Sequence, residues 1–143
     1  VILGDIRHSR VAHSDILALQ LLGVKEIRLV GPTAFMPEQP ISGCTNYVDR
    51  DEALKNADVI MTLRIQHERL GQAMTLSKDE YFAADGNSPK ELKLAKPQAI
   101  VMDPGPMNRG VEIASSVADG PQSVILQQVK NGVAARMAVL AEM

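Results

Sequence analysis

Two polar stretches of the sequence combine residue types that can hold an anion. Arg10 lies in "GDIRHSRVAHS" (4–14), and Arg64 and Gln66 lie in "TLRIQHERL" (62–70). An arginine guanidinium can bind a carboxylate or a phosphate through two parallel hydrogen bonds. Arg64 and Gln66 alternate with apolar residues, so both would point to the same side of an extended segment. An arginine beside an amide suits a substrate that carries carboxylate and amine groups.

A third stretch, "DPGPMNRGVEI" (103–113), follows the apolar run at 99–102 and contains two prolines and a glycine. Proline fixes φ and removes a backbone donor, so the carbonyl groups of Pro104 and Gly105 are held in set directions. They could accept hydrogen bonds from a substrate nitrogen. A cis bond before Pro106 fits this stretch, because X-Pro bonds tolerate the cis form. A tight exit from a strand would need the same residues, so this stretch alone does not decide between the two interpretations.

The arginines also have purely structural interpretations. Arg10 could be a solvent-exposed residue near a helix start, and Glu68 and Arg69 could simply pair with each other at the surface. Ser9 or a neighbour could cap the helix that begins there, and the free amides of a helix start attract negative charge. Taken one at a time, these stretches are therefore compatible both with an anion-binding site and with an ordinary solvent-exposed surface.

Short apolar runs recur along the chain and predict the strands of a sheet. The runs are continuous rather than alternating, which is typical of strands buried on both faces of a parallel sheet. They lie at 1–3, 27–30, 59–63 and 99–102, with a weaker candidate at 45–48. The intervening segments predict helices at 9–22 (closed by Gly23), at 51–56, from Ser77, from Ser88 and at 123–143. In the last helix one apolar stripe is formed by Leu126, Val129, Val133, Met137 and Leu140.

This alternation predicts one α/β domain over residues 1–143, a three-layer open parallel sheet flanked by helices. In such a sheet, ligands bind beyond the carboxyl ends of the strands. The stretches that follow the strands are "GDIRHSR", "GPTAFMP", "RIQHER" and "DPGPMNR", and three of these four contain arginine. We therefore expect a basic cleft at one edge of the sheet, built to hold an anion.

The fold is Rossmann-like, but Gly4 is not followed by the second and third glycines of a dinucleotide fingerprint. We therefore expect no nicotinamide cofactor. The histidines, His8, His13 and His67, lack metal-ligand spacing, and Cys44 is the only cysteine. We expect no metal site, no disulfide and no cofactor of another kind.

The composition restricts the partners. The net charge of −2 and an aromatic content of 3% argue against nucleic acid. No apolar run is long enough to cross a bilayer, so we expect no membrane partner, and the single cysteine fits a reducing cytoplasm. The chain begins with Val1 inside a predicted strand and without an initiator methionine, so we expect a piece of a longer protein.

Four stretches, taken together and in this order, resemble the aspartate-binding domain of the aspartate carbamoyltransferase family: "GDIRHSRVAHS", "LRIQHERL", "PGPMNRGVEI" and "QQVKNGVAARMAVL". The resemblance implies that Arg10 and Arg64 bind the two carboxylates of L-aspartate, with Gln66 as a partner of Arg64. It implies that the carbonyls of Pro104 and Gly105 meet the amino group or the transferred carbamoyl nitrogen, and that the Gly105–Pro106 bond is cis.

The implied reaction is attack by the amino group of L-aspartate on the carbamoyl carbon of carbamoyl phosphate, with release of phosphate. Carbamoyl phosphate would be bound through a second domain that this chain lacks, so we expect no catalytic residue in this domain alone and no activity of the isolated chain. The resemblance also implies a homotrimeric parent protein, to which a neighbouring subunit contributes part of the site.

The sequence departs from the family at Asp103, where the family usually has histidine. A carboxylate at ~4 Å from an anionic substrate would cost roughly 4 kcal/mol at an effective dielectric of ~20, although Arg109 could screen it. Two alternatives remain. A non-catalytic, structural or regulatory subunit is favoured by Asp103, and an ornithine carbamoyltransferase is opposed by the absence of that family's Ser-Met-Gly segment and of a cysteine in the proline loop.

Overall fold

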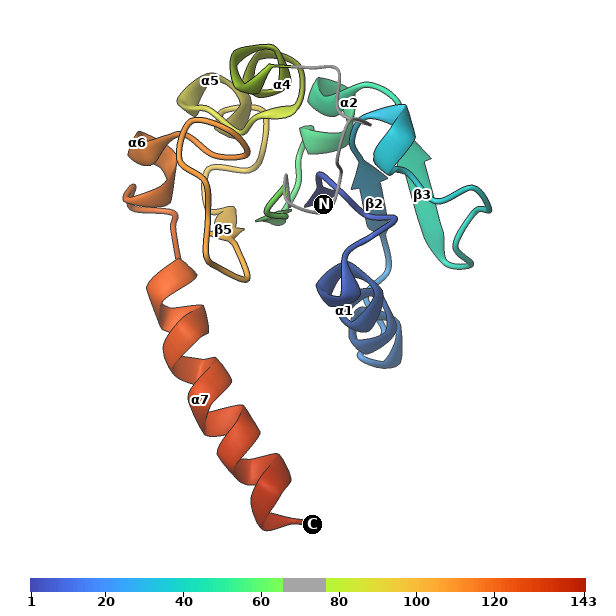
Figure 1. The fold of residues 1–143 in the computed structure, drawn as a ribbon, viewed down its shortest axis with the longest axis vertical. Coiled ribbons are helices and arrows are strands. Elements are labelled where there is room, and N and C mark those ends of the chain that lie inside the picture. The colour runs from blue at the N-terminus through green and yellow to red at the C-terminus, as the bar shows by residue number, and fades with distance from the viewer. Residues whose placement is uncertain (66–76) are drawn as a thin grey trace.

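The structure, a computed structural model, describes residues 1–65 and 77–143 (Figure 1). The strands are β1 (Ile2–Leu3), β2 (Ile27–Val30), β3 (Cys44–Tyr47), β4 (Val59–Thr62) and β5 (Ile100–Met102). The helices are α1 (Arg10–Leu21), α2 (Arg50–Leu54), α4 (Lys78–Asp85), α5 (Pro89–Leu92), α6 (Ser115–Ala118) and α7 (Ile125–Ala141), with a short 3₁₀ turn η1 at Thr33–Phe35. The predicted strands are confirmed, including the weaker one, whereas α6 and η1 were not expected.

All five strands are parallel and lie in the order β3-β2-β1-β4-β5. The chain first moves outward from β1 to β2 and β3, and then returns to the other side of β1 with β4. The direction of winding therefore changes between β1 and β4. A crevice forms at such a switch point beyond the carboxyl ends of the strands, which is where a ligand is expected.

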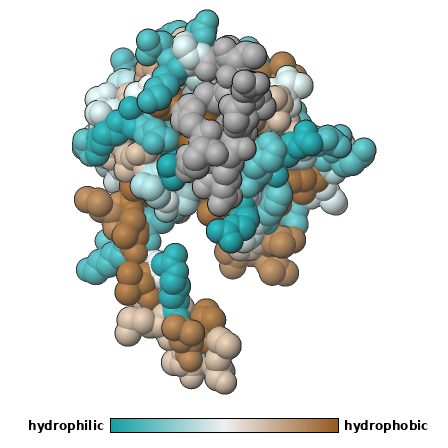
Figure 2. All heavy atoms as spheres, in the orientation of Figure 1, coloured by the Kyte–Doolittle hydropathy of each residue, from teal (hydrophilic) through white to brown (hydrophobic). Residues whose placement is uncertain are grey.

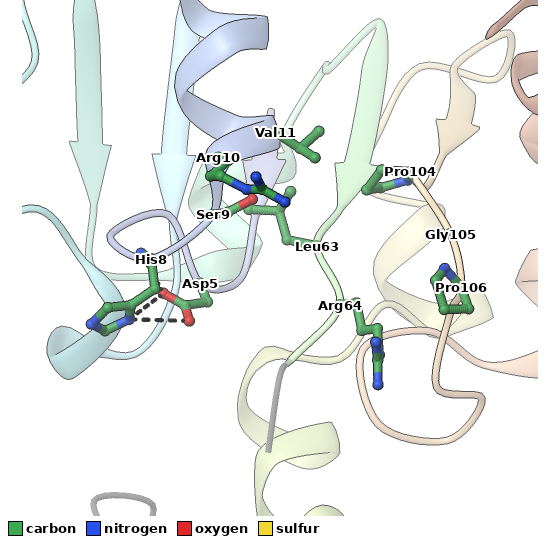
Figure 3. A pocket seen from close by; sticks show the side chains of 10 residues that line it. All are labelled: Asp5, His8, Ser9, Arg10, Val11, Leu63, Arg64, Pro104, Gly105 and Pro106. Carbon is green, nitrogen blue, oxygen red and sulfur yellow. Dashed lines mark hydrogen bonds and ion pairs between the residues drawn. The ribbon is translucent and has the colours of Figure 1, made fainter. Parts of the chain in front are cut away.

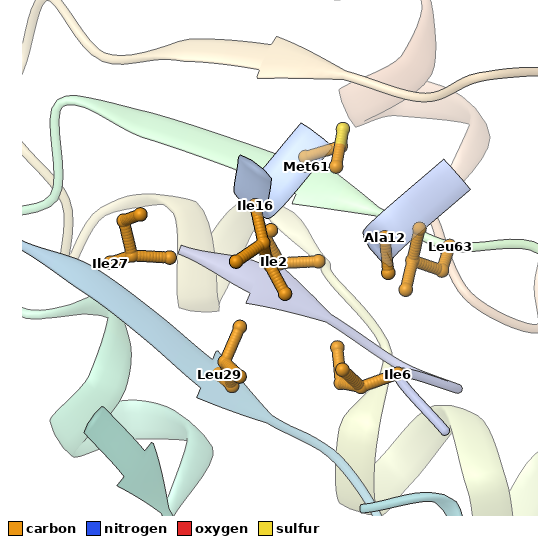
Figure 4. Close-up of a cluster of buried hydrophobic side chains, with 8 residues drawn as sticks. All are labelled: Ile2, Ile6, Ala12, Ile16, Ile27, Leu29, Met61 and Leu63. Carbon is orange, nitrogen blue, oxygen red and sulfur yellow. The ribbon is translucent and has the colours of Figure 1, made fainter. Parts of the chain in front are cut away.

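Helices cover both faces of the sheet. On one face, Ile2, Leu29 and Met61 pack with Ala12 and Ile16 of α1 (Figure 4). On the other face, alternate strand residues pack against α2, α5, α6 and the segments beside them; these buried contacts involve Leu3, Val30, Ala53, Leu54, Ile60, Ala95, Val101, Ile113 and Val117. Because successive side chains of a strand point to opposite faces, continuous apolar strands supply both layers. The predicted three-layer α/β architecture is confirmed.

The predicted helix starts are set by side chains that accept backbone hydrogen bonds. The Ser9 hydroxyl accepts from the Ala12 amide at 3.1 Å and caps α1. Reciprocal capping boxes, in which a serine and a glutamate each bond the other's backbone amide, begin α4 at Ser77 and α5 at Ser88. These caps satisfy amides that have no partner within the helix and fix where each helix begins.

The ends of β1 and β2 approach so closely that only glycine fits at position 31. A Cβ on Gly31 would lie 2.3 Å from the Gly4 carbonyl oxygen. That oxygen also accepts a hydrogen bond from the Ile6 amide at 3.0 Å, so it is held in place.

Gly31→Ala is therefore expected to lower the free energy of unfolding by about 2–4 kcal/mol. Gly132→Ala, in exposed α7, is the matched control, and there alanine should raise the unfolding free energy by about 0.5–1 kcal/mol. Urea titration measures the unfolding free energy of each variant. Equal effects of the two substitutions would contradict the close approach of Gly31 to the Gly4 carbonyl.

The last helix departs from the expectation of a packed stripe. In α7 only Ile125 is buried, and the helix projects away from the sheet (Figure 1). The stripe residues are exposed, with Leu126 at 84% and Leu140 at 70%, and Figure 2 shows apolar surface along the projecting helix. Within the described ranges, no helix is long and apolar enough to cross a membrane.

Candidate functional site

A cavity of about 120 Å³ opens at the carboxyl ends of β1, β4 and β5 (Figure 3). By the usual requirement of ~10–15 Å³ for one water, it has room for an amino-acid-sized ligand. It is lined by Asp5, His8, Ser9, Arg10, Val11, Leu63, Arg64, Pro104, Gly105 and Pro106. Segments that are far apart in the sequence meet here because β1 lies between β2 and β4, at the switch point of the sheet.

Arg10 is the first residue of α1, and its exposed side chain reaches toward the middle of the cavity (Figure 3). The Ser9 cap fixes the start of the helix and therefore the position of the Arg10 backbone. The start of a helix carries a partial positive charge. This charge and the guanidinium both favour an anion in the same place.

Arg64 follows β4 and lines the cavity from the side opposite α1 (Figure 3). It is half-buried, between Leu63 and Ile65, whose side chains are buried in two different clusters. The sheet thus brings Arg10 and Arg64 to one cavity, as the sequence predicted. Gln66, the third predicted polar residue, lies outside the described residues, as do Glu68 and Arg69.

Among the described residues, fewer arginines line the cavity than the sequence predicted. Arg7 pairs with Glu38 at 2.5 Å, and Arg109 pairs with Asp119 through two contacts of 2.6 and 2.8 Å. These arginines, and the stretch at 31–37, are not among the described residues that line the cavity. Arg7 and Arg109 do not reach the cavity because Glu38 and Asp119 bind their guanidinium groups outside it.

Asp5 is a lining residue that the sequence analysis did not consider. It is 4% exposed, and its Oδ1 accepts from the His8 amide at 3.1 Å and lies 2.9 Å from His8 Nδ1. The His8 ring also packs edge-on against Phe35. An aspartate two residues after a buried strand, at the edge where ligands bind, was the signal available in the sequence. Asp5 therefore lines the same cavity as the two arginines, and its side chain is engaged by His8 (Figure 3).

Asp103 was expected to bring a carboxylate against the substrates, and the structure corrects this. The side chain is fully buried and does not line the cavity. Its Oδ1 accepts from the Gly105 amide at 2.7 Å, and its Oδ2 accepts from the Thr62 hydroxyl at 2.8 Å. Burial raises the pKa of Asp103, and these two hydrogen bonds act in the opposite direction. Arg109, suggested as a screen for this charge, pairs with Asp119 instead.

The loop that Asp103 holds has the backbone that the prolines predict. The Gly105–Pro106 bond is cis, as expected. Gly105 has a φ of +62°, a conformation that side-chain-bearing residues rarely adopt, and this explains the glycine between the two prolines. Pro104, Gly105 and Pro106 form the wall of the cavity that faces α1 (Figure 3).

Glu112 is a second buried carboxylate behind the same loop, and nothing in the sequence analysis pointed to it. It accepts a hydrogen bond from the Asn108 amide, and the Asn108 side chain donates to the Ile65 carbonyl at 3.3 Å. Burial raises the pKa of Glu112 to about 7; the Asn108 amide acts against the rise, and the Asp103 charge adds to it. Two buried carboxylates therefore accept backbone amides of this segment, Asp103 from Gly105 and Glu112 from Asn108.

The raised pKa of Glu112 predicts a pH-dependent stability. The folded state holds a proton that the unfolded state loses near pH 4.5, so this contribution is fully present below that pH and is lost as the pH rises through about 7. Relative to Glu112→Gln, the unsubstituted protein is expected to lose about 1–3 kcal/mol of unfolding free energy between pH 5 and pH 8. Denaturant titrations at these two pH values measure the difference, and parallel pH profiles of the two proteins would contradict the buried proton.

No group of histidine, cysteine, aspartate or glutamate side chains within 1–65 and 77–143 is placed to hold a metal ion. The chemistry that the lining residues offer is charge recognition by Arg10 and Arg64, beside a loop in which Pro104 and Pro106 have no backbone N–H to donate. Such a cavity can bind and orient a small molecule that carries both carboxylate and amine groups.

The family model of the aspartate/ornithine carbamoyltransferase Asp/Orn binding domain matches residues 1–143. The chain belongs to this family. It is 56% identical over 140 residues to the aspartate carbamoyltransferase catalytic subunit of Ruthia magnifica subsp. Calyptogena magnifica, a match that covers 97% of this chain and 44% of that protein. The chain therefore spans less than half the length of this relative.

Solved structures of both branches of the carbamoyltransferase family share the fold. The ornithine carbamoyltransferase of Pyrococcus furiosus matches with a TM-score of 0.81 and 26% identity over 98% of this chain and 47% of that one. The aspartate transcarbamoylase of Trypanosoma cruzi in complex with aspartate and phosphate matches with a TM-score of 0.77 and 28% identity, over 97% of this chain and 48% of that one. The resemblance stated from the sequence is confirmed at the level of the family.

Proposed function

We propose that this chain is the aspartate-binding half of an aspartate carbamoyltransferase, which transfers the carbamoyl group of carbamoyl phosphate to L-aspartate in pyrimidine biosynthesis. The observation that carries the proposal is the meeting of Arg10 and Arg64 in one amino-acid-sized cavity, which the proline loop at 104–106 also lines. Two guanidinium groups match the two carboxylates of aspartate. The 56% identity to an aspartate carbamoyltransferase catalytic subunit supports the same assignment.

In the proposed reaction, the arginines fix both carboxylates, so that the α-amino group has one position relative to the second substrate. The carbonyls of Pro104 and Gly105 accept hydrogen bonds from that amine or from the carbamoyl nitrogen. The neutral amine attacks the carbamoyl carbon, the bond from that carbon to the phosphate oxygen breaks, and phosphate leaves while the nitrogen loses a proton. Within this domain no residue is assigned a catalytic role beyond binding and orientation.

The second substrate needs a second domain. We propose that a carbamoyl phosphate-binding domain, outside residues 1–143, completes the site, and the match to less than half of the relative's length supports this. The exposed apolar stripe of α7 is a surface that such a domain could cover. The isolated chain would then bind aspartate weakly and have no transferase activity. We further propose a homotrimeric, cytoplasmic parent protein.

The assembly proposal has its own test. Sedimentation of the full-length protein is expected to show a trimer, and a stable monomer would contradict it. In the same protein, Leu140→Glu is expected to lower the melting temperature, because α7 would be packed there. If the unfolding of the full-length protein is indifferent to this charge, α7 is as exposed as it is in the chain alone.

Ornithine carbamoyltransferase is the competing activity, and the high structural similarity to the Pyrococcus furiosus enzyme is the observation in its favour. That similarity concerns a fold that the aspartate-specific relatives share. The lining has two arginines and one carboxylate, Asp5, which already contacts His8, so a second carboxylate on the ligand is favoured over the side-chain cation of ornithine. A non-catalytic subunit was favoured only by Asp103, whose buried position removes the reason for it.

Titration calorimetry of the full-length protein in phosphate buffer tests the substrate class. L-Aspartate and succinate, which share two carboxylates, are expected to bind, and L-ornithine is not. Binding of ornithine with no response to either dicarboxylate would refute the proposal. Arg7→Ala serves as the control for a general loss of positive charge, because Arg7 pairs with Glu38 and is not among the lining residues.

A further inference from the structure

We infer that Asp103 is a positioning residue, which fixes the carbonyl loop at 104–106 relative to the strand end that carries Arg64. The carboxylate connects the loop at 104–106 with the end of β4, and the distance between these two segments must stay fixed. One oxygen accepts from the amide of Gly105, in the cavity wall, and the other accepts from the hydroxyl of Thr62, the last residue of β4. The inference deepens the proposed function, on which the role of the loop carbonyls rests.

Because of the two prolines, the hydrogen bond from the Gly105 amide to Asp103 decides which backbone groups the loop can present to a ligand. Pro104 and Pro106 have no backbone N–H, so the Gly105 amide is the only backbone donor between them. Asp103 uses that donor at 2.7 Å. The backbone of the loop is left with carbonyl acceptors alone, which suits a ligand nitrogen and not a ligand oxygen anion.

The contact to Thr62 continues the sheet beyond its last paired residues. β4 and β5 are in register up to Met61 and Met102, and the Asp103–Thr62 bond of 2.8 Å lies one residue further along both strands. Arg64 is two residues beyond Thr62. A change in the Asp103–Thr62 bond therefore shifts the loop carbonyls relative to Arg64.

Other contacts of Asp103 support its fixed position. Its backbone amide donates to Gln128 Oε1 of α7 at 3.1 Å, so the residue is held on both sides. The side chain is fully buried, and the Gly105 amide and the Thr62 hydroxyl that donate to its carboxylate are both neutral groups. The carboxylate accepts from both partners at once, whereas an alanine would leave the Gly105 amide without this acceptor and the Thr62 hydroxyl with only its longer contact of 3.3 Å to the Met102 carbonyl.

The test compares Asp103→Ala, Asp103→Asn and Thr62→Val in the full-length protein. Within the loop only Gly105 carries an amide hydrogen, because both prolines lack one, and hydrogen exchange resolved to single amides by NMR follows it directly. Asp103→Ala is expected to speed this exchange at least tenfold, and Asp103→Asn, which keeps one acceptor oxygen, should change it much less. Asp119→Asn, at the surface pair with Arg109, is the matched control and should leave it unchanged.

The kinetic arm measures carbamoyl-aspartate formation per folded molecule. Asp103→Ala is expected to lower kcat/KM for aspartate about 10–100-fold, because a displaced loop misorients the amine. Asp103→Asn should show much less of this loss than Asp103→Ala, and the effects of Thr62→Val and Asp103→Ala should be less than additive in the double variant. A residue needed only for stability would change the melting temperature and leave kcat/KM of the folded protein as it was.

Unchanged Gly105 exchange in Asp103→Ala would overturn the inference, and so would faster exchange with kcat/KM within twofold of the unsubstituted protein. If Asp103→Ala does not fold, Thr62→Val decides, because it removes the hydroxyl from which Asp103 Oδ2 accepts; unchanged kcat/KM for aspartate in that variant would overturn the inference. If the unsubstituted protein forms no carbamoyl-aspartate, the proposed function fails separately, and the exchange rates alone decide whether Asp103 holds the loop.

Discussion

Replacing Arg64 with alanine in the full-length protein is expected to lower kcat/KM for aspartate by roughly 10²–10³-fold. The side chain is half-buried at the switch point of the sheet, where a charged hydrogen bond to a ligand carboxylate is poorly screened by water. Removing one partner of such a pair typically costs about 2–5 kcal/mol, and each ~1.4 kcal/mol is a factor of ten in rate. Steady-state kinetics with aspartate as the varied substrate measure the loss.

Arg109→Ala is the matched control for Arg64. It removes the same side chain from a position beyond the proline loop, where the guanidinium pairs with Asp119 at the surface. We expect its kcat/KM to stay within about threefold of the unsubstituted protein, because exposed ion pairs contribute at most ~1 kcal/mol. Equal losses in the two variants would show that general charge, and not the Arg64 position, accounts for binding.

Arg10→Ala is expected to cost about 30–100-fold in kcat/KM for aspartate, somewhat less than Arg64→Ala, because Arg10 is exposed to solvent at the start of α1. Arg10→Lys should recover little, since an ammonium cannot reproduce two parallel hydrogen bonds to a carboxylate. The loss should appear mainly in KM for aspartate if Arg10 binds the ground state and the transition state alike.

The control for Arg10 lies three residues earlier. Arg7→Ala removes an arginine from the same loop, but its partner Glu38 lies outside the cavity. Kinetics of Arg7→Ala close to those of the unsubstituted protein are expected. If Arg10→Lys were as active as the unsubstituted protein, a point charge would suffice and the bidentate contact would be wrong.

Much of the fold was predictable because its signals are local. Continuous apolar runs identified the parallel strands, and Ser9, Ser77 and Ser88 marked the helix starts through the hydrogen bonds that their hydroxyls accept. The stripe of α7 was predictable as a pattern, but the sequence could not show what it packs against. In the structure it is exposed, because an amphipathic pattern fixes which side of a helix is apolar without naming its partner.

The site was predictable where it depends on topology and unpredictable where it depends on side-chain direction. Parallel strands bring their carboxyl ends to one edge, so the meeting of Arg10 and Arg64 followed from the order of the elements. Asp103 could not be placed in this way, because a residue at the end of a strand can face the cavity or the interior. It faces the interior, where Thr62 and Gly105 supply the donors that a buried carboxylate needs.

The most direct test of the central claim is an assay of the full-length protein with carbamoyl phosphate and either L-aspartate or L-ornithine as the acceptor. The account predicts that carbamoyl-aspartate and phosphate form in equal amounts, and that ornithine at the same concentration gives no product. Carbamoylation of ornithine, or a folded protein that transfers to neither amino acid, would contradict the assignment of this cavity to aspartate.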